Sequence, residues 1–76
     1  MTELTFGQKA VGTSFNPSGN AAVDDCKQLC ADLIDQMHKL RVETTDSEQA
    51  RLASIAITEL QGAQMWAVKA LTWSKP

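Results

Sequence analysis

Apolar residues recur at helical spacing over residues 21–43. Steps of three and four residues alternate along this stretch, which is typical of the seam of an amphipathic helix. The seam consists of Val23, Cys26, Cys30, Leu33, Met37 and Leu40. In the preceding NPSGN, Pro17 suits the second position of a type I turn and Gly19 suits the fourth. Asn20 is then the expected N-cap residue of the helix.

A second helical pattern follows the short polar segment ETTDSEQ. Within that segment, Thr45 and Glu48 have the S/T-x-x-E spacing of a capping box, which predicts a helix over about residues 46–73. A connection this short makes the two helices antiparallel neighbours. The pattern thus predicts an all-α fold, an antiparallel helical hairpin over residues 21–76.

The second helix carries two apolar stripes rather than one. One stripe contains Leu52, Ile55, Ala56, Ala63, Trp66, Ala67 and Ala70, and the other contains Ala53, Ile57, Leu60, Val68 and Leu71. The first helix can cover only one of them, so we expect the second stripe to contact other copies of the chain in a homo-oligomer. The expected interface residues are Leu60, Met65, Val68, Leu71 and Trp73. A two-chain four-helix bundle without a ligand is the simpler alternative.

The first twenty residues show no sustained periodicity. They contain Gly7, Gly12, Pro17 and Gly19, which predicts an irregular N-terminal arm ahead of the hairpin domain. The segment MTELTFGQKA also lacks the apolar core of a secretory signal, which favours a cytoplasmic protein.

Composition adds a second argument for self-association. The 76 residues suit one domain, and 43% of them are hydrophobic. Because a domain of this size buries only about 60% of its unfolded-chain surface, a chain this apolar is expected to pack against its copies. The net charge of −2 argues against a general surface for nucleic-acid polymers. Glu59 and Lys69 interrupt the most apolar segment, which argues against a membrane span.

Patterns typical of catalysis are scarce. The chain has no Ser/His/Asp arrangement and no Gly-rich phosphate loop of the Walker type, and His38 is its single histidine. Cys26 and Cys30 lie one helical turn apart without two further metal ligands, so we interpret them as reduced thiols packed like small apolar residues. Asp24 and Asp25 suit the positive end of the helix dipole. We expect a binding protein, not an enzyme, with no metal and no cofactor.

The segment FNPSGNAAVDDCK groups the parts of a ligand site. Phe15 offers an aromatic face for a base, and Lys27 offers a cation for a phosphodiester. Between them lies a tight turn whose N–H groups precede a helix N-terminus. The turn residues are Asn16, Pro17, Ser18 and Gly19. In the alternative interpretation, Phe15 is a plug that fixes the arm to the helices, and Lys27 is solvated.

A second cation lies late in the second helix. Lys69 interrupts an otherwise apolar stretch and follows Trp66 by three residues. In one interpretation its stem covers apolar surface while the ammonium group reaches solvent. In the other, several copies of Lys69 form a ring of charge around the axis of an oligomer.

Two segments, FNPSGNAAVDDCK and RLASIAITELQGAQMWAVKALTW, resemble the helical-hairpin family of phage-encoded cyclic-nucleotide sponges. That family includes the anti-CBASS sponge for cyclic oligonucleotides, which is the more similar, and the anti-Thoeris sponge for glycocyclic ADP-ribose. The resemblance implies a homohexamer that binds cyclic dinucleotides such as 3′,3′-cGAMP between paired protomers, with Phe15 on a base and Lys27 at a phosphate. It also implies a second pocket, for cyclic trinucleotides, at Lys69, Trp66 and Thr72.

Such a protein would sequester immune signals without cleaving them, in the cytoplasm of the infected bacterium, and so block CBASS defence. In an isologous interface each residue occurs twice, which matches the two bases and two phosphates of a cyclic dinucleotide. Two alternatives stay open. One is sequestration of glycocyclic ADP-ribose, and the other is a ligand-free structural or adaptor oligomer.

Overall fold

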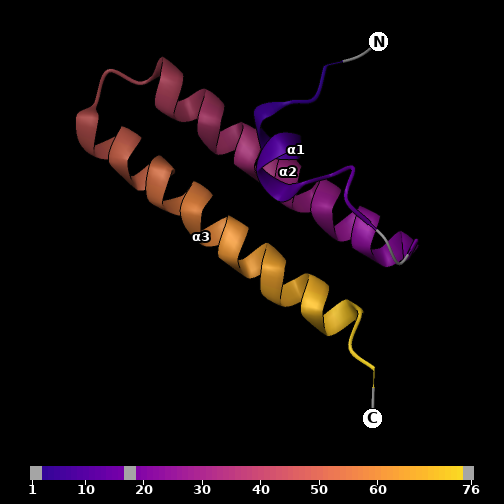
Figure 1. Ribbon diagram of the computed structural model, residues 1–76. Helices are drawn as coiled ribbons and strands as arrows, with labels where there is room; N and C mark the ends of the chain where they lie inside the picture. Colours follow the sequence, from indigo (N-terminus) through magenta and orange to yellow (C-terminus); the bar gives the residue numbers. More distant parts are fainter. Residues whose placement is uncertain (1–2, 17–18, 75–76) are drawn as a thin grey trace.

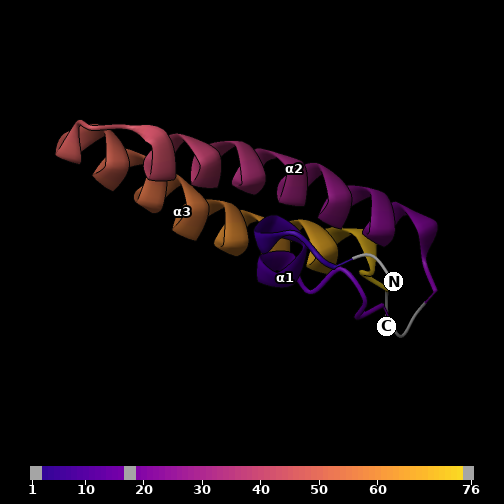
Figure 2. The same ribbon diagram turned by 90° about the horizontal axis from the view of Figure 1, so that it is seen from above.

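The fold is a long helical hairpin with a short third helix packed on it. The computed structural model describes residues 3–16 and 19–74. Within these ranges the helices are α1 (Phe6–Val11), α2 (Ala21–Glu43) and α3 (Ser47–Leu71), and there is no strand. Figures 1 and 2 show α2 and α3 running side by side in opposite directions. The all-helical hairpin predicted from the sequence is therefore confirmed.

The N-terminal arm contains a helix, so the prediction of an irregular arm over residues 1–20 is wrong for residues 6–11. A complete capping box starts α1: the Thr5 hydroxyl accepts the Gln8 N–H, and the Gln8 side chain accepts the Thr5 N–H. Gly12 ends the helix in the left-handed conformation, with φ of 64°. The sequence contains both signals of this helix, the T-x-x-Q spacing of a capping box and the glycine after the last turn. A helix of six residues is too short to show a hydrophobic periodicity.

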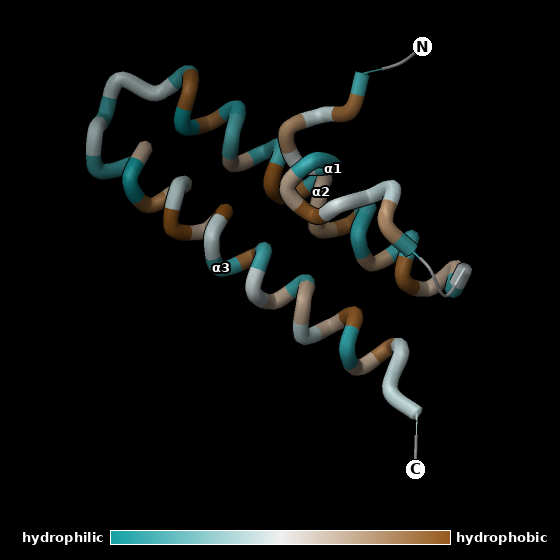
Figure 3. The backbone as a smooth tube through the Cα atoms, viewed as in Figure 1, coloured by the Kyte–Doolittle hydropathy of each residue, from teal (hydrophilic) through white to brown (hydrophobic). Residues whose placement is uncertain are grey.

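The core lies where the three helices meet, and Figure 3 shows apolar positions recurring along both long helices. Its buried cluster comprises Val11, Ala31, Ile34 and Ile57, with Ala10, Cys30, Met37 and Leu60 packed against it. On α2 the buried residues are Val23, Lys27, Ala31 and Ile34, whereas Leu33 of the predicted seam is exposed. The buried face is rotated because α1 packs on α2 beside α3.

In the N-terminal half of α3, the stripe that was expected to contact other copies packs within the protomer instead. Ala53 and Ile57 are buried within the protomer, and the half-buried Leu60 packs against the core, so Leu60 has contacts inside the protomer and its place in an intermolecular interface stays a prediction. The opposite stripe is mostly exposed, including Leu52 and Ile55, with Ala56 and Ala67 half-buried. In the buried cluster, Val11 of α1 joins Ala31 and Ile34 of α2 and Ile57 of α3. Within the Ala53–Ile57–Leu60 stripe, Ile57 and Leu60 reach this cluster.

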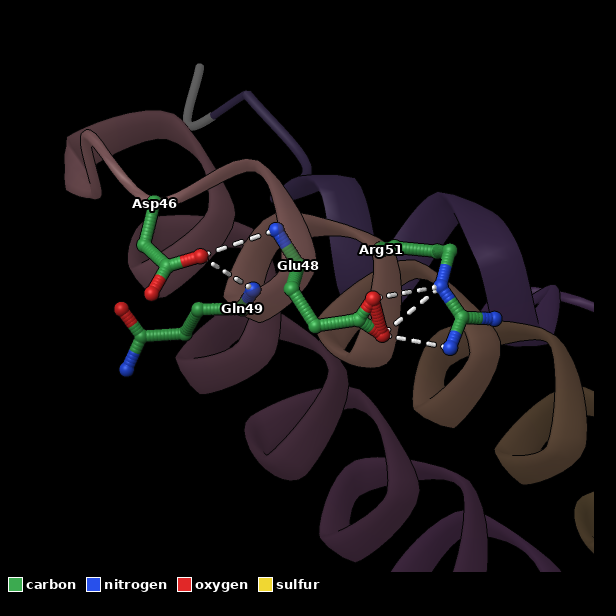
Figure 4. Close-up of polar contacts among 4 residues, drawn as sticks. All are labelled: Asp46, Glu48, Gln49 and Arg51. Carbon is green, nitrogen blue, oxygen red and sulfur yellow. Dashed lines mark hydrogen bonds and ion pairs between the residues drawn. The ribbon is translucent and has the colours of Figure 1, made fainter.

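The predicted cap of α2 is confirmed, and that of α3 is wrong. The Asn20 side chain accepts the Ala22 N–H. On α3, Asp46 and not Thr45 is the N-cap, because its carboxylate accepts the N–H groups of Glu48 and Gln49 at 2.9 and 3.2 Å (Figure 4).

The C-terminal end of α3 also differs from expectation. The helix ends at Leu71, two residues before the expected end. Thr72 is the C-cap residue, with φ of −102° and ψ of 7°, and its hydroxyl donates to the Val68 carbonyl at 2.8 Å. A hydroxyl bonded to the preceding turn competes with continuation of the helix.

Candidate ligand-binding site

The loop between α1 and α2 places Phe15 directly over Lys27. Lys27 lies in the second turn of α2 and is only 5% exposed. Its ammonium group donates to the Gly12 carbonyl at 3.0 Å and also to the Phe15 carbonyl. The same nitrogen lies 5.5 Å from the centroid of the Phe15 ring, within the range of a cation–π contact. The two residues predicted to form the site are thus brought together.

Phe15 itself is exposed. Its residue is 71% accessible, so the interpretation of Phe15 as a buried plug is wrong, and so is that of Lys27 as a solvated residue. A buried ammonium group must be compensated by hydrogen bonds, and the two loop carbonyls provide them. The Phe15 ring therefore faces outward, while the backbone carbonyl of Phe15 is bound to Lys27 of α2. Of the three N–H donors of a lysine, one is not used by these carbonyls.

The described amides between Phe15 and the first turn of α2 include two that are bonded to nearby backbone carbonyls. The Gly19 N–H donates to the Asn16 carbonyl at 3.1 Å, and the Val23 N–H donates to the Asn20 carbonyl at 3.0 Å. Gly19 has φ of 66°, which a residue with a side chain rarely adopts. The Gly19 N–H is therefore used within the turn, and the assignment of Gly19 to the ligand site stays a prediction. Pro17 and Ser18, also predicted for the site, lie outside the described residues.

Asn16 connects the turn to α2. Its side-chain amide donates to the Asn20 carbonyl and to the Asp24 carboxylate, both at 2.9 Å. The bond to Asp24 holds one acidic group of the first helical turn against the loop. Asn16 thus connects the loop to the first turn of α2, in addition to the bonds that Lys27 makes with Gly12 and Phe15.

Thr13 was not predicted as a site residue, but it lies in the same loop between Gly12 and Phe15. Its hydroxyl oxygen is buried and has no hydrogen-bond partner among the described residues. A buried hydroxyl without a partner is uncommon in folded proteins. Sequence periodicity gives no signal for such an atom, because Thr13 lies in a loop.

Two of the residues predicted for the second pocket, Trp66 and Lys69, line an open groove on α3. The groove has a volume of about 320 Å³ and is lined by Gly62, Met65, Trp66 and Lys69. The Lys69 ammonium nitrogen lies 5.4 Å from the centroid of the Trp66 ring. Thr72, predicted with them, uses its hydroxyl on the Val68 carbonyl instead.

The remaining residues predicted for an interface lie in the C-terminal half of α3 and, for Trp73, two residues after the helix ends. Met65, Leu71 and Trp73 are exposed, at 64%, 41% and 67%, and Val68 is half-buried. Large apolar side chains gathered on one exposed segment are typical of surfaces that contact another molecule. No helix in the described ranges has the length and apolarity needed to cross a membrane.

The cysteines form a pair of free thiols. Burial raises the pKa of Cys30, and the neighbouring Cys26 raises it further through its charge and a hydrogen bond. The described residues contain no group of three or more His, Cys, Asp or Glu side chains that could hold a metal ion.

Comparison with known proteins supports the resemblance seen in the sequence. Residues 8–72 match the Acb2/Tad1 hairpin domain. No curated protein and no solved structure matches the chain. The matched range includes α2, α3, Phe15 and most of α1. Since it covers most of the chain, the protein belongs to the Acb2/Tad1 hairpin-domain family, whose members are sponge-type binding proteins for cyclic-nucleotide signals in anti-defence.

Proposed function

We propose that the protein sequesters a cyclic dinucleotide such as 3′,3′-cGAMP without cleaving it, and thereby blocks CBASS defence in the cytoplasm of the infected bacterium. The observation that carries the proposal is the exposed Phe15 ring, which is held over the Lys27 ammonium group. Membership of the Acb2/Tad1 family supports the ligand class. The loop is preorganised, because Lys27 binds the backbone of the residue that carries the ring.

The two residues offer complementary contacts to a cyclic dinucleotide. Stacking of a base on an aromatic side chain contributes about 1–3 kcal/mol. The positive charge beneath the ring favours a phosphate at the edge of the site. If two protomers pair face to face, two copies of Phe15 and Lys27 serve both halves of a two-fold symmetric ligand. This stoichiometry, one ligand per two chains, is part of the proposal.

Calorimetry with 3′,3′-cGAMP tests the proposal, followed by heat release of the ligand and chromatography. We expect intact nucleotide to be recovered. A linear product would overturn the non-catalytic part, and a lack of binding would overturn the ligand. Glycocyclic ADP-ribose belongs in the same titration series. Tight binding of that ligand alone, with inequivalent halves of the site, would assign the protein to Thoeris signals instead.

The variant Phe15→Ala should weaken binding by about 1–3 kcal/mol, the range for loss of base stacking. Because the ring is exposed, the thermal unfolding temperature of the free protein should stay unchanged. Phe15→Trp should keep the affinity, and Phe15→Leu, which is apolar without a ring, should not. Equal affinity in the alanine and wild-type proteins would place the site elsewhere.

The variant Lys27→Ala should weaken binding by about 1.5–3 kcal/mol, the range for hydrogen bonds to charged groups. Unlike Phe15→Ala, it should also change the free protein, because the Gly12 and Phe15 carbonyls lose their hydrogen bonds to the Lys27 ammonium group. Hydrogen exchange over residues 12–16 measures that change. An unchanged affinity would remove Lys27 from the site.

We propose the groove at Gly62, Met65, Trp66 and Lys69 as a second site, for cyclic trinucleotides, completed by other copies of the chain. The supporting observation is the Lys69 ammonium group held at the face of Trp66 beside an open apolar surface. Lys69→Ala should weaken binding of a cyclic trinucleotide and leave 3′,3′-cGAMP affinity unchanged. A parallel loss of both ligands would contradict two separate sites. A ligand-free adaptor predicts no thermal stabilisation by either ligand.

A further inference from the structure

Two side chains of α2 hold α1 at its opposite ends. Near its beginning, the Gly7 N–H donates to the Asp35 carboxylate at 2.7 Å. Just past its end, the Gly12 carbonyl accepts from Lys27 at 3.0 Å. Asp35 and Lys27 are eight residues apart, which places them on similar sides of α2, separated by about 12 Å along its axis. An anionic group thus meets the positive end of α1, and a cationic group meets its negative end.

The approach of α1 to α2 is close at the Asp35 end. A Cβ atom added to Gly7 would lie 2.1 Å from the Ala31 carbonyl oxygen and 2.9 Å from the Asp35 carboxylate. The backbones of the two helices are therefore in direct contact there. This contact is what lets a short side chain such as Asp35 reach the Gly7 amide.

A ring contact adds to the same anchor. The Phe6 ring stacks on His38 of α2, with centroids 4.3 Å apart and planes inclined by 10°. Arg41 covers the Phe6 ring at 5.2 Å, donates to His38, and reaches the Ser54 hydroxyl of α3 at 3.2 Å. The beginning of α1 is therefore fixed to both long helices. A displacement of α1 would also move the loop that follows it.

We propose that Asp35 is a positioning residue of the ligand site. It holds the Gly7 amide, and through the six residues of α1 it fixes the backbone from Gly12 to Phe15 over Lys27. The direction of the Phe15 ring then depends on a carboxylate that does not touch the ligand. This inference rests on the proposed function, in which Phe15 stacks on a base of the cyclic dinucleotide.

The test compares Asp35→Ala with Asp35→Asn in titrations with 3′,3′-cGAMP. The alanine variant should lose about tenfold in affinity, which corresponds to one lost hydrogen bond to a charged group. The asparagine variant should stay within about threefold of wild type, because its amide oxygen still accepts the Gly7 N–H at the strength of a neutral hydrogen bond.

Asp32→Ala is the matched control for charge. Asp32 lies on the same helix, is exposed, and accepts from the Gln28 side chain at 2.7 Å. Removing its charge changes the electrostatics toward an anionic ligand in the same direction as Asp35→Ala. We expect its affinity to equal or slightly exceed that of wild type. A loss as large as that of Asp35→Ala would overturn the positioning role.

Hydrogen exchange and a double-mutant cycle separate positioning from general destabilisation. In Asp35→Ala, amides of residues 6–15 should exchange faster while those of α3 stay protected. With Phe15→Ala already present, adding Asp35→Ala should cost little further affinity, because the two residues act through one ring. Fully additive losses would overturn the inference. If the wild-type protein binds no cyclic nucleotide, the proposed function fails and the inference with it, whereas wild-type binding with an unaffected Asp35→Ala variant overturns the inference alone.

Discussion

Gly7 and Gly62 both lie inside helices, but an added methyl group would meet different surroundings at each. At Gly7 it would overlap the Ala31 carbonyl, and at Gly62 nothing lies within 4 Å. The same substitution therefore separates a helix-propensity effect from a packing effect. Propensity alone favours alanine over glycine by about 0.8–1.0 kcal/mol at either position.

We expect Gly7→Ala to destabilise the docking of α1 by about 1–3 kcal/mol, the cost of overpacking a tight contact. The gain in helix propensity is too small to offset the overlap with α2. Hydrogen exchange of residues 6–11 and thermal unfolding measure the effect. A variant as stable as wild type would contradict the backbone contact between α1 and α2.

Gly62→Ala is the counterpart and should stabilise α3 by about 0.5–1 kcal/mol. Urea unfolding followed by circular dichroism measures it. A loss of stability would instead reveal that another copy of the chain approaches the backbone at Gly62, in the groove that this residue shares with Trp66.

Cys30 should react slowly with alkylating reagents at pH values below the range in which free thiols ionise. Burial is the largest cause of its raised pKa, and Cys26 adds to it. Because the thiolate is the reactive form, iodoacetamide at pH 8 should modify Cys30 more slowly than glutathione, even in Cys26→Ala. Mass spectrometry gives the rate, and equal rates would contradict burial as the cause.

The same shift has a consequence for stability. The pKa of Cys30 is higher in the folded state. The stability that this shift contributes is therefore fully present below the pKa of the thiol in the unfolded chain, and it is lost as the pH rises through the pKa of the thiol in the folded protein. The free energy of unfolding should therefore fall on the alkaline side more in the wild-type protein than in Cys30→Ala.

At the scale of elements, each long helix begins at a polar side chain that binds its first amides. For α3 this is Asp46, whose carboxylate accepts two N–H groups (Figure 4). The neighbouring pair of Glu48 and Arg51, 2.5 Å apart, lies on the exposed surface. Exposed ion pairs contribute little to stability, so the cap and not the ion pair determines where α3 begins.

We expect Asp46→Ala to lower the free energy of unfolding by about 1 kcal/mol, the typical effect of losing an N-cap. Thr45→Ala, one residue earlier, should have almost no effect, although the sequence pattern names Thr45 as the cap. Urea unfolding of the two variants measures the difference. A larger loss of unfolding free energy in Thr45→Ala than in Asp46→Ala would support the capping box predicted from the sequence.

At the scale of the whole molecule, the protomer is a thin layer of helices. The Cα atoms span 50 × 32 × 12 Å, and the exposed apolar residues include Leu52, Met65, Trp66 and Trp73. In a layer this thin, one face of the helices has no other part of the protomer to cover its apolar side chains. This geometry supports the proposal of a homo-oligomer, for which the family resemblance implies six copies.

Light scattering at micromolar concentration should give a multiple of the 8.3 kDa chain mass, with a hexamer expected. Met65→Glu should shift the protein toward smaller species, because it places a charge in the exposed apolar surface of α3. Gln36→Glu adds the same charge at an exposed position of α2 and should not. A well-folded monomer in the wild type would contradict the proposal.

Both candidate sites could be recognised from the sequence only in part. Phe15 and Lys27 stood out as an aromatic and a cation on either side of a turn. Their contact, and the burial of Lys27, could not be predicted, because the carbonyls that bind Lys27 belong to a loop 12 and 15 residues earlier in the chain. Asp35 gave no signal at all, since its partner Gly7 is 28 residues away.

The sequence by itself determined the features that depend on near neighbours: the periodicity of α2 and α3, the Asn20 cap, and the Gly19 turn. Hydrogen bonds within a few residues and helical spacing decide these locally. Only the tertiary structure decided which face of each long helix is buried, why Leu60 belongs to the core, and how Phe15 is presented. The physical reason is α1, whose contact with α2 through Gly7 depends on close backbone packing between residues far apart in the chain.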